Sequence, residues 1–152
     1  MDNVSNEQTK ALNKLITTLY DGENGYKEAA EEVDSVSLAT KFREMSQQRY
    51  NFGHEIKPFI TQLGGKVDKG GSTGAALHRA WIDIKSALST QDEAAVLQEC
   101  IRGDEDAVET YRKVLNDTSY SSDARQVITR QLETFERNVA ELKQLKQTYK
   151  NV

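Results

Sequence analysis

The chain has 152 residues, with 24 acidic and 20 basic side chains and a formal net charge of −4 at pH 7. This length favours a single domain over residues 1–152. The net acidic charge argues against binding to a nucleic-acid backbone, which normally needs a basic face. Because Cys100 is the only cysteine, an internal disulfide framework and a cysteine-based zinc cluster are excluded.

The scarcity of proline is the most informative feature of the composition. Only Pro58 is present, although proteins average about 5% proline. Because proline is the main breaker of helices, this chain can be mostly helical. No stretch approaches the roughly 18 apolar residues of a membrane span, and the first ten residues lack the apolar core of a secretory signal. We therefore expect a cytoplasmic protein with no membrane partner.

Two long amphipathic helices are predicted in the first half of the chain. Apolar residues recur there at steps of three and four, which places them on one helical face. The first helix is predicted over about residues 5–33 and the second over about 37–63, with a short polar turn between them. Pro58 lies inside the second pattern and predicts a kink near His54. Gly64 follows that pattern and predicts the end of the helix.

The second half of the chain predicts three more helices. A glycine-rich loop over residues 64–74 lacks the residue order of a phosphate-binding loop. After it we expect a short helix over 73–88 and long helices over 91–116 and 122–149. The turns inside each pair of long helices are short, so each pair forms an antiparallel hairpin. The predicted fold class is therefore all-α: a ferritin-like four-helix bundle of two hairpins, joined by a long crossover that contains the short helix. The end of the bundle at which the third long helix begins stays open.

Three charged residues interrupt the apolar stripes near the middle of their helices. The three-four stepping passes through Glu23 in the first long helix, Arg49 in the second and Asp104 in the third. The stripe of the fourth long helix meets no charge. If the helices are in register, these three residues form one buried polar layer.

Two interpretations of this layer compete. In the structural one, the Arg49 guanidinium uses its five donors to pair with the carboxylates of Glu23 and Asp104. In the metal-binding one, Glu23, Asp104, Glu105 and Glu136 coordinate two metal ions. Such a site usually also needs a histidine on each of two helices, whereas Arg49 occupies a position where the site needs a ligand. The structural interpretation is favoured, and we expect no metal or other cofactor.

Glycines inside the helical patterns suggest a third interpretation. Gly22, Gly25, Gly53 and Gly103 each cost helix stability relative to alanine. They indicate either close approach of helices, room for a water or a small ligand near the layer, or simply glycine tolerated on a long helix. Cys100, next to the apolar stripe, is expected to be a buried and inert thiol.

Four sequence blocks carry a resemblance to a known family. They are LNKLITTLYDGENGYKEAAEEV, FREMSQQRYNFGHEI with LGG after it, ECIRGDEDAVETYRKVL and RQLETFERNVAELKQL. Over about residues 8–147 the chain resembles the domain-of-unknown-function 2383 family of small bacterial four-helix bundles, grouped with the ferritin-like superfamily. More distantly it is similar to rubrerythrin-like di-iron domains. That resemblance places Glu23 and Asp104 at positions of metal-binding carboxylates, but Arg49 and Phe52 where a Glu and a His are expected.

Together these observations predict a non-enzymatic bacterial bundle, either an interaction protein or a stress-related structural protein. It is expected to act through a helical surface or by self-association, so a protein partner or a homo-oligomer is expected. The alternative is an iron- or manganese-binding carboxylate bundle of the oxidase or metal-storage type.

Overall fold

Every described element of the chain is an α-helix. The computed structural model describes residues 3–68 and 84–150. The all-α fold class is confirmed, and each end of the four long helices lies within two residues of its predicted position. Most of the predicted short helix over 73–88 lies outside the described residues. The described helices are α1 (Asn3–Glu32), α2 (Val36–Gln62), α4 (Ile84–Ser89), α5 (Glu93–Asp117) and α6 (Ser122–Lys150).

Short polar side chains define where three of the long helices begin. Ser35, Asp92 and Ser121 precede α2, α5 and α6, and each accepts hydrogen bonds from backbone N–H groups in the first turn. These bonds satisfy donors that have no partner inside the helix. α2 continues through Pro58 and is followed by Gly64, whose φ of 77° lies in the left-handed region that favours glycine.

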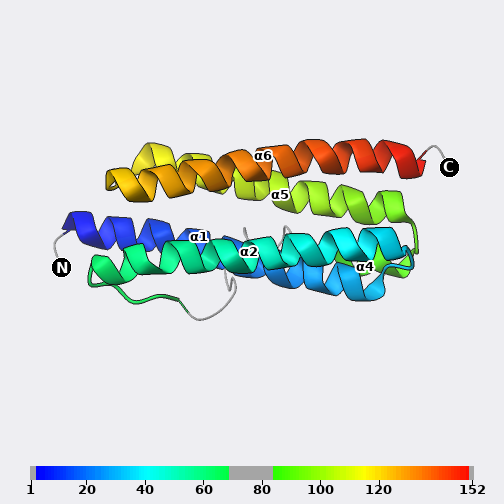
Figure 1. Cartoon of the computed structure of the whole chain (residues 1–152), viewed down its shortest axis with the longest axis horizontal. Helices are drawn as coiled ribbons and strands as arrows, with labels where there is room; N and C mark the ends of the chain where they lie inside the picture. The colour runs from blue at the N-terminus through cyan, green and yellow to red at the C-terminus, as the bar shows by residue number, and fades with distance from the viewer. Residues whose placement is uncertain (1–2, 69–83, 151–152) are drawn as a thin grey trace.

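The long helices form two antiparallel hairpins that lie against each other (Figure 1). α1 pairs with α2 and α5 pairs with α6, while α1 also packs on α5 and α2 on α6. α5 begins at the end of the bundle where α1 ends, so α2 and α5 run in the same direction (Figure 1). The end of α2 and the start of α5 therefore lie at opposite ends of the bundle. This answers the question, left open by the sequence, of the end at which the third long helix begins. None of the described helices is long and apolar enough to cross a membrane.

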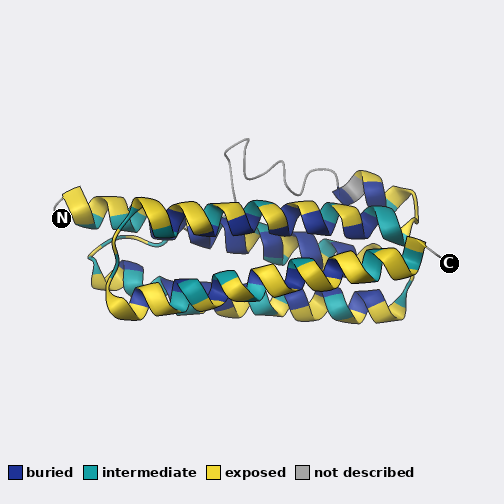
Figure 2. Cartoon of the chain, turned by 90° about the horizontal axis from the view of Figure 1, so that it is seen from above, coloured by how far each residue is buried: buried dark blue, intermediate teal, exposed yellow. Residues whose placement is uncertain are grey.

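Buried residues gather along the inward sides of the helices (Figure 2). They form two apolar clusters, one toward each end of the bundle. The first includes Leu15, Ile56, Tyr111, Ile128 and Phe135, and the second includes Phe42, Met45, Leu97, Cys100 and Leu142. Burying such side chains removes apolar surface from water and is the main favourable contribution to folding. The most deeply buried charged residues lie between these two clusters.

Candidate functional site: a buried ion-pair layer

A buried ion pair joins α2 to α5. Arg49 and Asp104 are each 1% exposed, and Nη2 of Arg49 lies 2.8 Å from Oδ2 of Asp104. Along α2, Arg49 stands between Met45 of the second cluster and Phe52 of the first. Opposite charges buried in this way depend on each other, because removing one leaves the other uncompensated in an apolar interior.

Aromatic rings and amides from the other helices enclose the guanidinium of Arg49. Its central carbon lies 4.9 Å from the ring centroid of Tyr26 on α1 and 4.4 Å from that of Phe135 on α6. These rings offer the cation their electron-rich faces. Nη1 donates to Oε1 of Gln48 at 2.6 Å, and the same oxygen accepts a hydrogen bond from Asn138 at 2.7 Å. With Asp104, the layer thus draws side chains from all four long helices.

Asp104 is held by a second polar partner. The hydroxyl of Tyr26 donates to Oδ2 of Asp104 at 2.8 Å. Burial raises the pKa of the Asp104 carboxyl, while the Arg49 guanidinium and the Tyr26 hydrogen bond act in the opposite direction. Burial and the nearby Asp104 charge raise the pKa of Tyr26 well above its usual range. Tyr26 therefore stays protonated and remains a hydrogen-bond donor to the carboxylate.

Glu23 does not lie in this layer, contrary to the expectation from the stepping. It is half-buried, and the place beside Asp104 is taken by the Tyr26 hydroxyl. The buried side of α1 runs from Leu19 through Gly22 to Tyr26 and so passes beside Glu23 rather than through it. Glu23 instead lines a pocket between α1 and α2.

The four carboxylates of the metal-binding interpretation are not gathered in one place. Asp104 lies in the core, whereas Glu105 and Glu136 are exposed on the second hairpin. Glu105 pairs with Lys143 at 3.3 Å, and Glu136 pairs with Arg112 at 2.7 Å. Within residues 3–68 and 84–150, no group of three or more His, Cys, Asp or Glu side chains is arranged to hold a metal ion.

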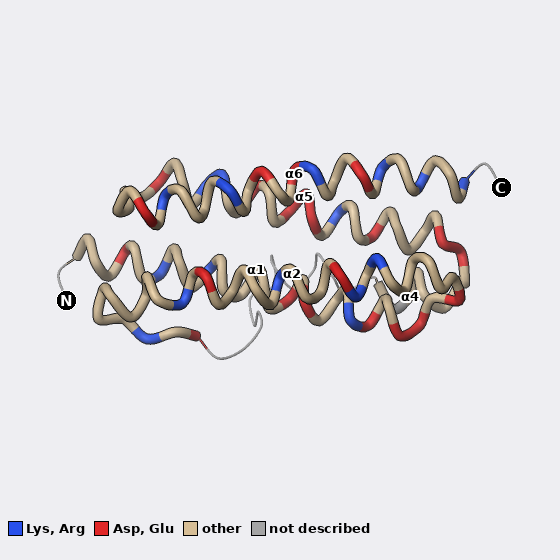
Figure 3. Tube along the Cα trace, in the orientation of Figure 1, with Lys and Arg blue, Asp and Glu red and all other residues tan. Residues whose placement is uncertain are grey.

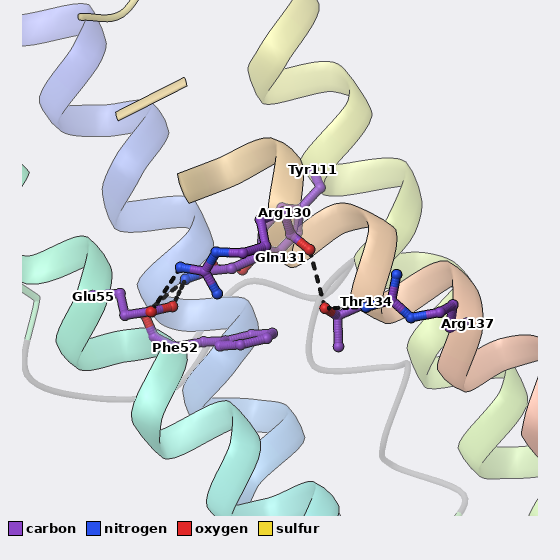
Figure 4. Close-up of polar contacts among 7 residues, drawn as sticks. All are labelled: Phe52, Glu55, Tyr111, Arg130, Gln131, Thr134 and Arg137. Atoms are coloured by element: carbon purple, nitrogen blue, oxygen red, sulfur yellow. Dashed lines mark hydrogen bonds and ion pairs between the residues drawn. The ribbon is translucent and has the colours of Figure 1, made fainter. Parts of the chain in front are cut away.

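A second buried polar link, which the sequence did not reveal, centres on Gln131 of α6 (Figure 4). Gln131 is fully buried. Its Oε1 accepts a hydrogen bond from the Tyr111 hydroxyl at 2.7 Å. Its Nε2 donates to the Phe52 carbonyl at 3.2 Å and to Glu55 at 2.9 Å. Glu55 is also paired with Arg130 at 2.7 Å, so this link joins α2, α5 and α6.

We expect Gln131→Leu to lower the free energy of unfolding by about 1–3 kcal/mol. The substitution leaves the Tyr111 hydroxyl without its acceptor in the core and removes the side-chain hydrogen bonds to the Phe52 carbonyl and to Glu55. Urea denaturation measures the change. Gln126→Leu, at an exposed position of the same helix, is the matched control and should shift stability by no more than about 0.5 kcal/mol. Equal midpoints for the two variants would contradict the role of Gln131.

Cys100 is expected to be unreactive in the folded protein. It is a free and fully buried thiol. Burial, followed by the charge of Asp104, raises its pKa well above the usual value. Since the thiolate is the reactive form, a disulfide reagent such as DTNB should label Cys100 only after denaturant is added. Native labelling as fast as that of free cysteine would contradict this expectation.

A family model described as a domain of unknown function, DUF2383, matches residues 7–117. The chain belongs to this family. The match covers most of α1 and all of α2, α4 and α5, and it ends before α6. No curated protein matches this DUF2383 member. Both partners of the Arg49–Asp104 pair lie inside the matched segment, whereas Gln131 lies beyond it.

Proposed function

We propose that this DUF2383 member is a non-catalytic, ferritin-like helical bundle that serves as an interaction or structural protein. The observation that carries the proposal is the Arg49–Asp104 ion pair in the core, with 2.8 Å between Nη2 and Oδ2. In ferritin-like di-metal proteins, inward carboxylates and histidines from facing helices build the metal site in the bundle core. Here a guanidinium, which is always protonated in proteins, neutralises an inward carboxylate.

Competition for Asp104 supports this proposal further. A divalent metal ion bound to Asp104 would have to displace Arg49, and the displaced guanidinium would remain in the core without a counter-charge. Leaving a buried charge unpaired costs about 3–5 kcal/mol. The rings of Tyr26 and Phe135 also pack against the guanidinium, which favours retention of the arginine.

The outer surface of the bundle favours contacts with protein. Acidic and basic residues are interspersed along the traces of both hairpins (Figure 3). Some of them already pair across helices, as Lys41 does with Glu141 at 2.6 Å. A mixed surface offers complementary charges to a protein partner or to a second copy of the chain. A nucleic-acid backbone would instead require clustered positive charge.

Metal content and metal uptake of the full chain test the proposal. We expect elemental mass spectrometry to find less than one iron or manganese ion per purified chain. Added ferrous ion should be oxidised by air no faster with the protein than without it. Asp104→Asn is the matched variant, because it removes the carboxylate that lies in the core beside Arg49. Stoichiometric metal in the native chain that is lost in Asp104→Asn would overturn the proposal and favour the metal-binding alternative. Light scattering across a range of concentrations then distinguishes self-association from a need for another protein.

A further inference from the structure

The outer face of the α1–α2 hairpin (the α1–α2 face) carries two exposed aromatic side chains beside a hollow. Tyr20 and Tyr50 are 43% and 47% exposed, and both line a pocket of about 470 Å³ between the two helices. The other large hydrophobic residues exposed within the described ranges, Val4 and Val36, lie at the starts of α1 and α2 and so at opposite ends of the bundle. Exposed tyrosines that lie together are typical of surfaces that contact another protein.

Gly53 leaves a recess beside Tyr50. A Cβ atom at this position would meet nothing within 4 Å beyond its own stretch of helix backbone, although Gly53 is buried and lines the same pocket. Close packing against another helix of the chain therefore does not explain the glycine, and alanine would be the better helix former. The α1–α2 face thus combines an exposed aromatic ring with a recess three residues further along α2.

His54 restricts the exposed ring of Tyr50. The two rings meet edge-on, with 4.6 Å between their centroids, and His54 is itself exposed one turn after Tyr50 on α2. Ordering a side chain on association costs free energy, and a side chain that is already restricted costs less. Tyr50 therefore suits the role of an anchor that enters a partner.

The charges beside the pocket are not neutralised within the chain. Glu23, Lys57 and Asp68 line it, and none of these side chains has an ion-pair partner among residues 3–68 and 84–150. Charges on the second hairpin, by contrast, pair with each other, as Glu105 does with Lys143 at 3.3 Å. Asp68 is exposed to water, whereas Glu23 and Lys57 are half-buried. Glu23 and Lys57 are thus the two opposite charges that gain most from a partner on this face.

Glu23 and Lys57 lie too far apart to pair with each other. The Ser46 hydroxyl donates to the backbone carbonyl of Glu23 at 2.9 Å, so Glu23 lies level with Ser46 of α2. Lys57 lies eleven residues further along α2, which corresponds to a rise of about 16 Å. The midpoint between these two levels falls between Tyr50 and Gly53. A two-fold axis that crosses α2 at this midpoint would place Tyr50 of one copy opposite Gly53 of another, and Glu23 beside Lys57.

We propose that the α1–α2 face binds a second copy of this chain in a two-fold symmetric dimer. The Tyr50 ring of each copy enters the recess at Gly53 of the other, and Lys57 of each copy faces Glu23 of the other. A second copy is favoured over a different protein because the face itself carries both halves of each contact, as a two-fold interface requires. This inference rests on the proposed interaction role and names the chain itself as the partner.

Sedimentation velocity of the full chain over a range of concentrations tests the dimer. We expect a monomer–dimer equilibrium with a dissociation constant in the micromolar range. Glu23→Lys and Lys57→Glu should each weaken the dimer at least about tenfold, because each places like charges opposite each other twice. Glu133→Lys makes the same change at an exposed position of α6 and should leave the dissociation constant unchanged. Circular dichroism establishes that each variant is folded.

Mixing the two charge variants identifies the pairing. In an equimolar mixture of Glu23→Lys and Lys57→Glu, both contacts between the two different chains join opposite charges. The mixture should therefore form a dimer about as stable as that of the native chain, although each variant alone is mainly monomeric. A mixture that dissociates as readily as the separate variants overturns the pairing of Glu23 with Lys57 and with it the proposed interface.

Filling the recess provides a second arm of the test. Gly53→Leu should weaken the dimer at least about tenfold, whereas Asn51→Leu, which adds the same side chain at an exposed position of α2, should leave it unchanged. If Gly53→Leu does not fold, Tyr50→Ala replaces it, with the same expected loss. A dimer that survives the replacement at Gly53 or Tyr50 undiminished overturns the proposed contact.

Failure of the dimer and failure of the proposed function give different results. A native chain that stays monomeric at millimolar concentration and binds no metal overturns the dimer, and leaves an interaction role with another protein in place. Stoichiometric metal that is lost in Asp104→Asn instead overturns the interaction role, whatever the state of association.

Discussion

Arg49→Met is expected to lower the free energy of unfolding by about 3–5 kcal/mol. Methionine keeps much of the length of the side chain but removes the charge that balances Asp104, which lies in the core 2.8 Å from Arg49. Urea denaturation followed by circular dichroism measures the loss. Arg43→Met, at an exposed position of the same helix, should change stability by no more than about 0.5 kcal/mol. A midpoint unchanged by Arg49→Met would show that Asp104 does not depend on this arginine.

The loss in Arg49→Met should also depend on pH. Burial raises the pKa of Asp104, and Arg49 is the main influence that lowers it, so removing Arg49 raises this pKa further. A carboxyl whose pKa is higher in the folded state binds its proton more tightly there. Its contribution to stability is therefore greatest below the unfolded pKa of about 3.9 and is lost as the pH rises through the folded pKa. The loss in free energy of unfolding caused by Arg49→Met should therefore be largest at neutral pH and should shrink in mild acid.

A double variant separates loss of charge balance from loss of packing. Arg49→Met combined with Asp104→Asn removes both charges and should recover most of the stability lost in the single variant, because no uncompensated charge remains in the core. It should also lose the extra pH dependence. A double variant as unstable at neutral pH as Arg49→Met alone would assign the loss to packing around Arg49 instead.

Phe135→Ala is expected to lower the free energy of unfolding by about 3–5 kcal/mol. Phe135 is buried, and its ring centroid lies 5.0 Å from that of Tyr111 and 6.0 Å from that of Phe52. It also lies 4.4 Å from the central carbon of the Arg49 guanidinium. Truncation thus opens a cavity between the first apolar cluster and the ion-pair layer. Thermal and urea denaturation measure the loss, and Phe135→Leu, which keeps more of the volume, should lose less. Equal stability of Phe135→Ala and the native chain would contradict this packing.

The long helices could be predicted because their apolar residues repeat over many turns. Such a repeat is a strong signal, and residues such as Asp92 mark helix starts by a local hydrogen-bond mechanism. The direction of the crossover could not be predicted in the same way. A connection as long as the one between α2 and α5 can reach either end of the bundle. Only the packing between the two hairpins therefore determines at which end α5 begins.

The polar layer was harder to predict, because steps of three and four both fit a helical stripe. From Leu19, a step of four leads to Glu23 and a step of three leads to Gly22. The buried side of α1 follows Gly22, but a glycine carries no hydrophobic signal that would reveal it. At Arg49 and Asp104 the step of the apolar stripe coincides with the buried side of the helix, which it does not at Glu23.

The polar residues of α6 were missed for a related reason. Gln131 and Asn138 are buried, while their apolar neighbours Leu132 and Val139 are only half-buried. A stripe chosen by hydrophobicity takes Leu132 and Val139 in place of Gln131 and Asn138, although it shares Ile128, Phe135 and Leu142 with the buried side of the helix. Gln131 and Asn138 lie seven residues apart, a spacing that places them on the same side of a helix. This repeat is the signal that could have identified them.

The placement of Arg49 and Asp104 on different hairpins has a consequence for folding. In a separated hairpin each charge faces water, where it needs no partner. Contacts within the α1–α2 hairpin are local in sequence and form quickly, whereas the Arg49–Asp104 contact awaits the docking of the two hairpins. Docking displaced by one helical turn would bury both charges apart from each other against the apolar clusters, at a cost of several kcal/mol per charge. We infer that the ion pair favours the observed docked arrangement over one displaced by a helical turn.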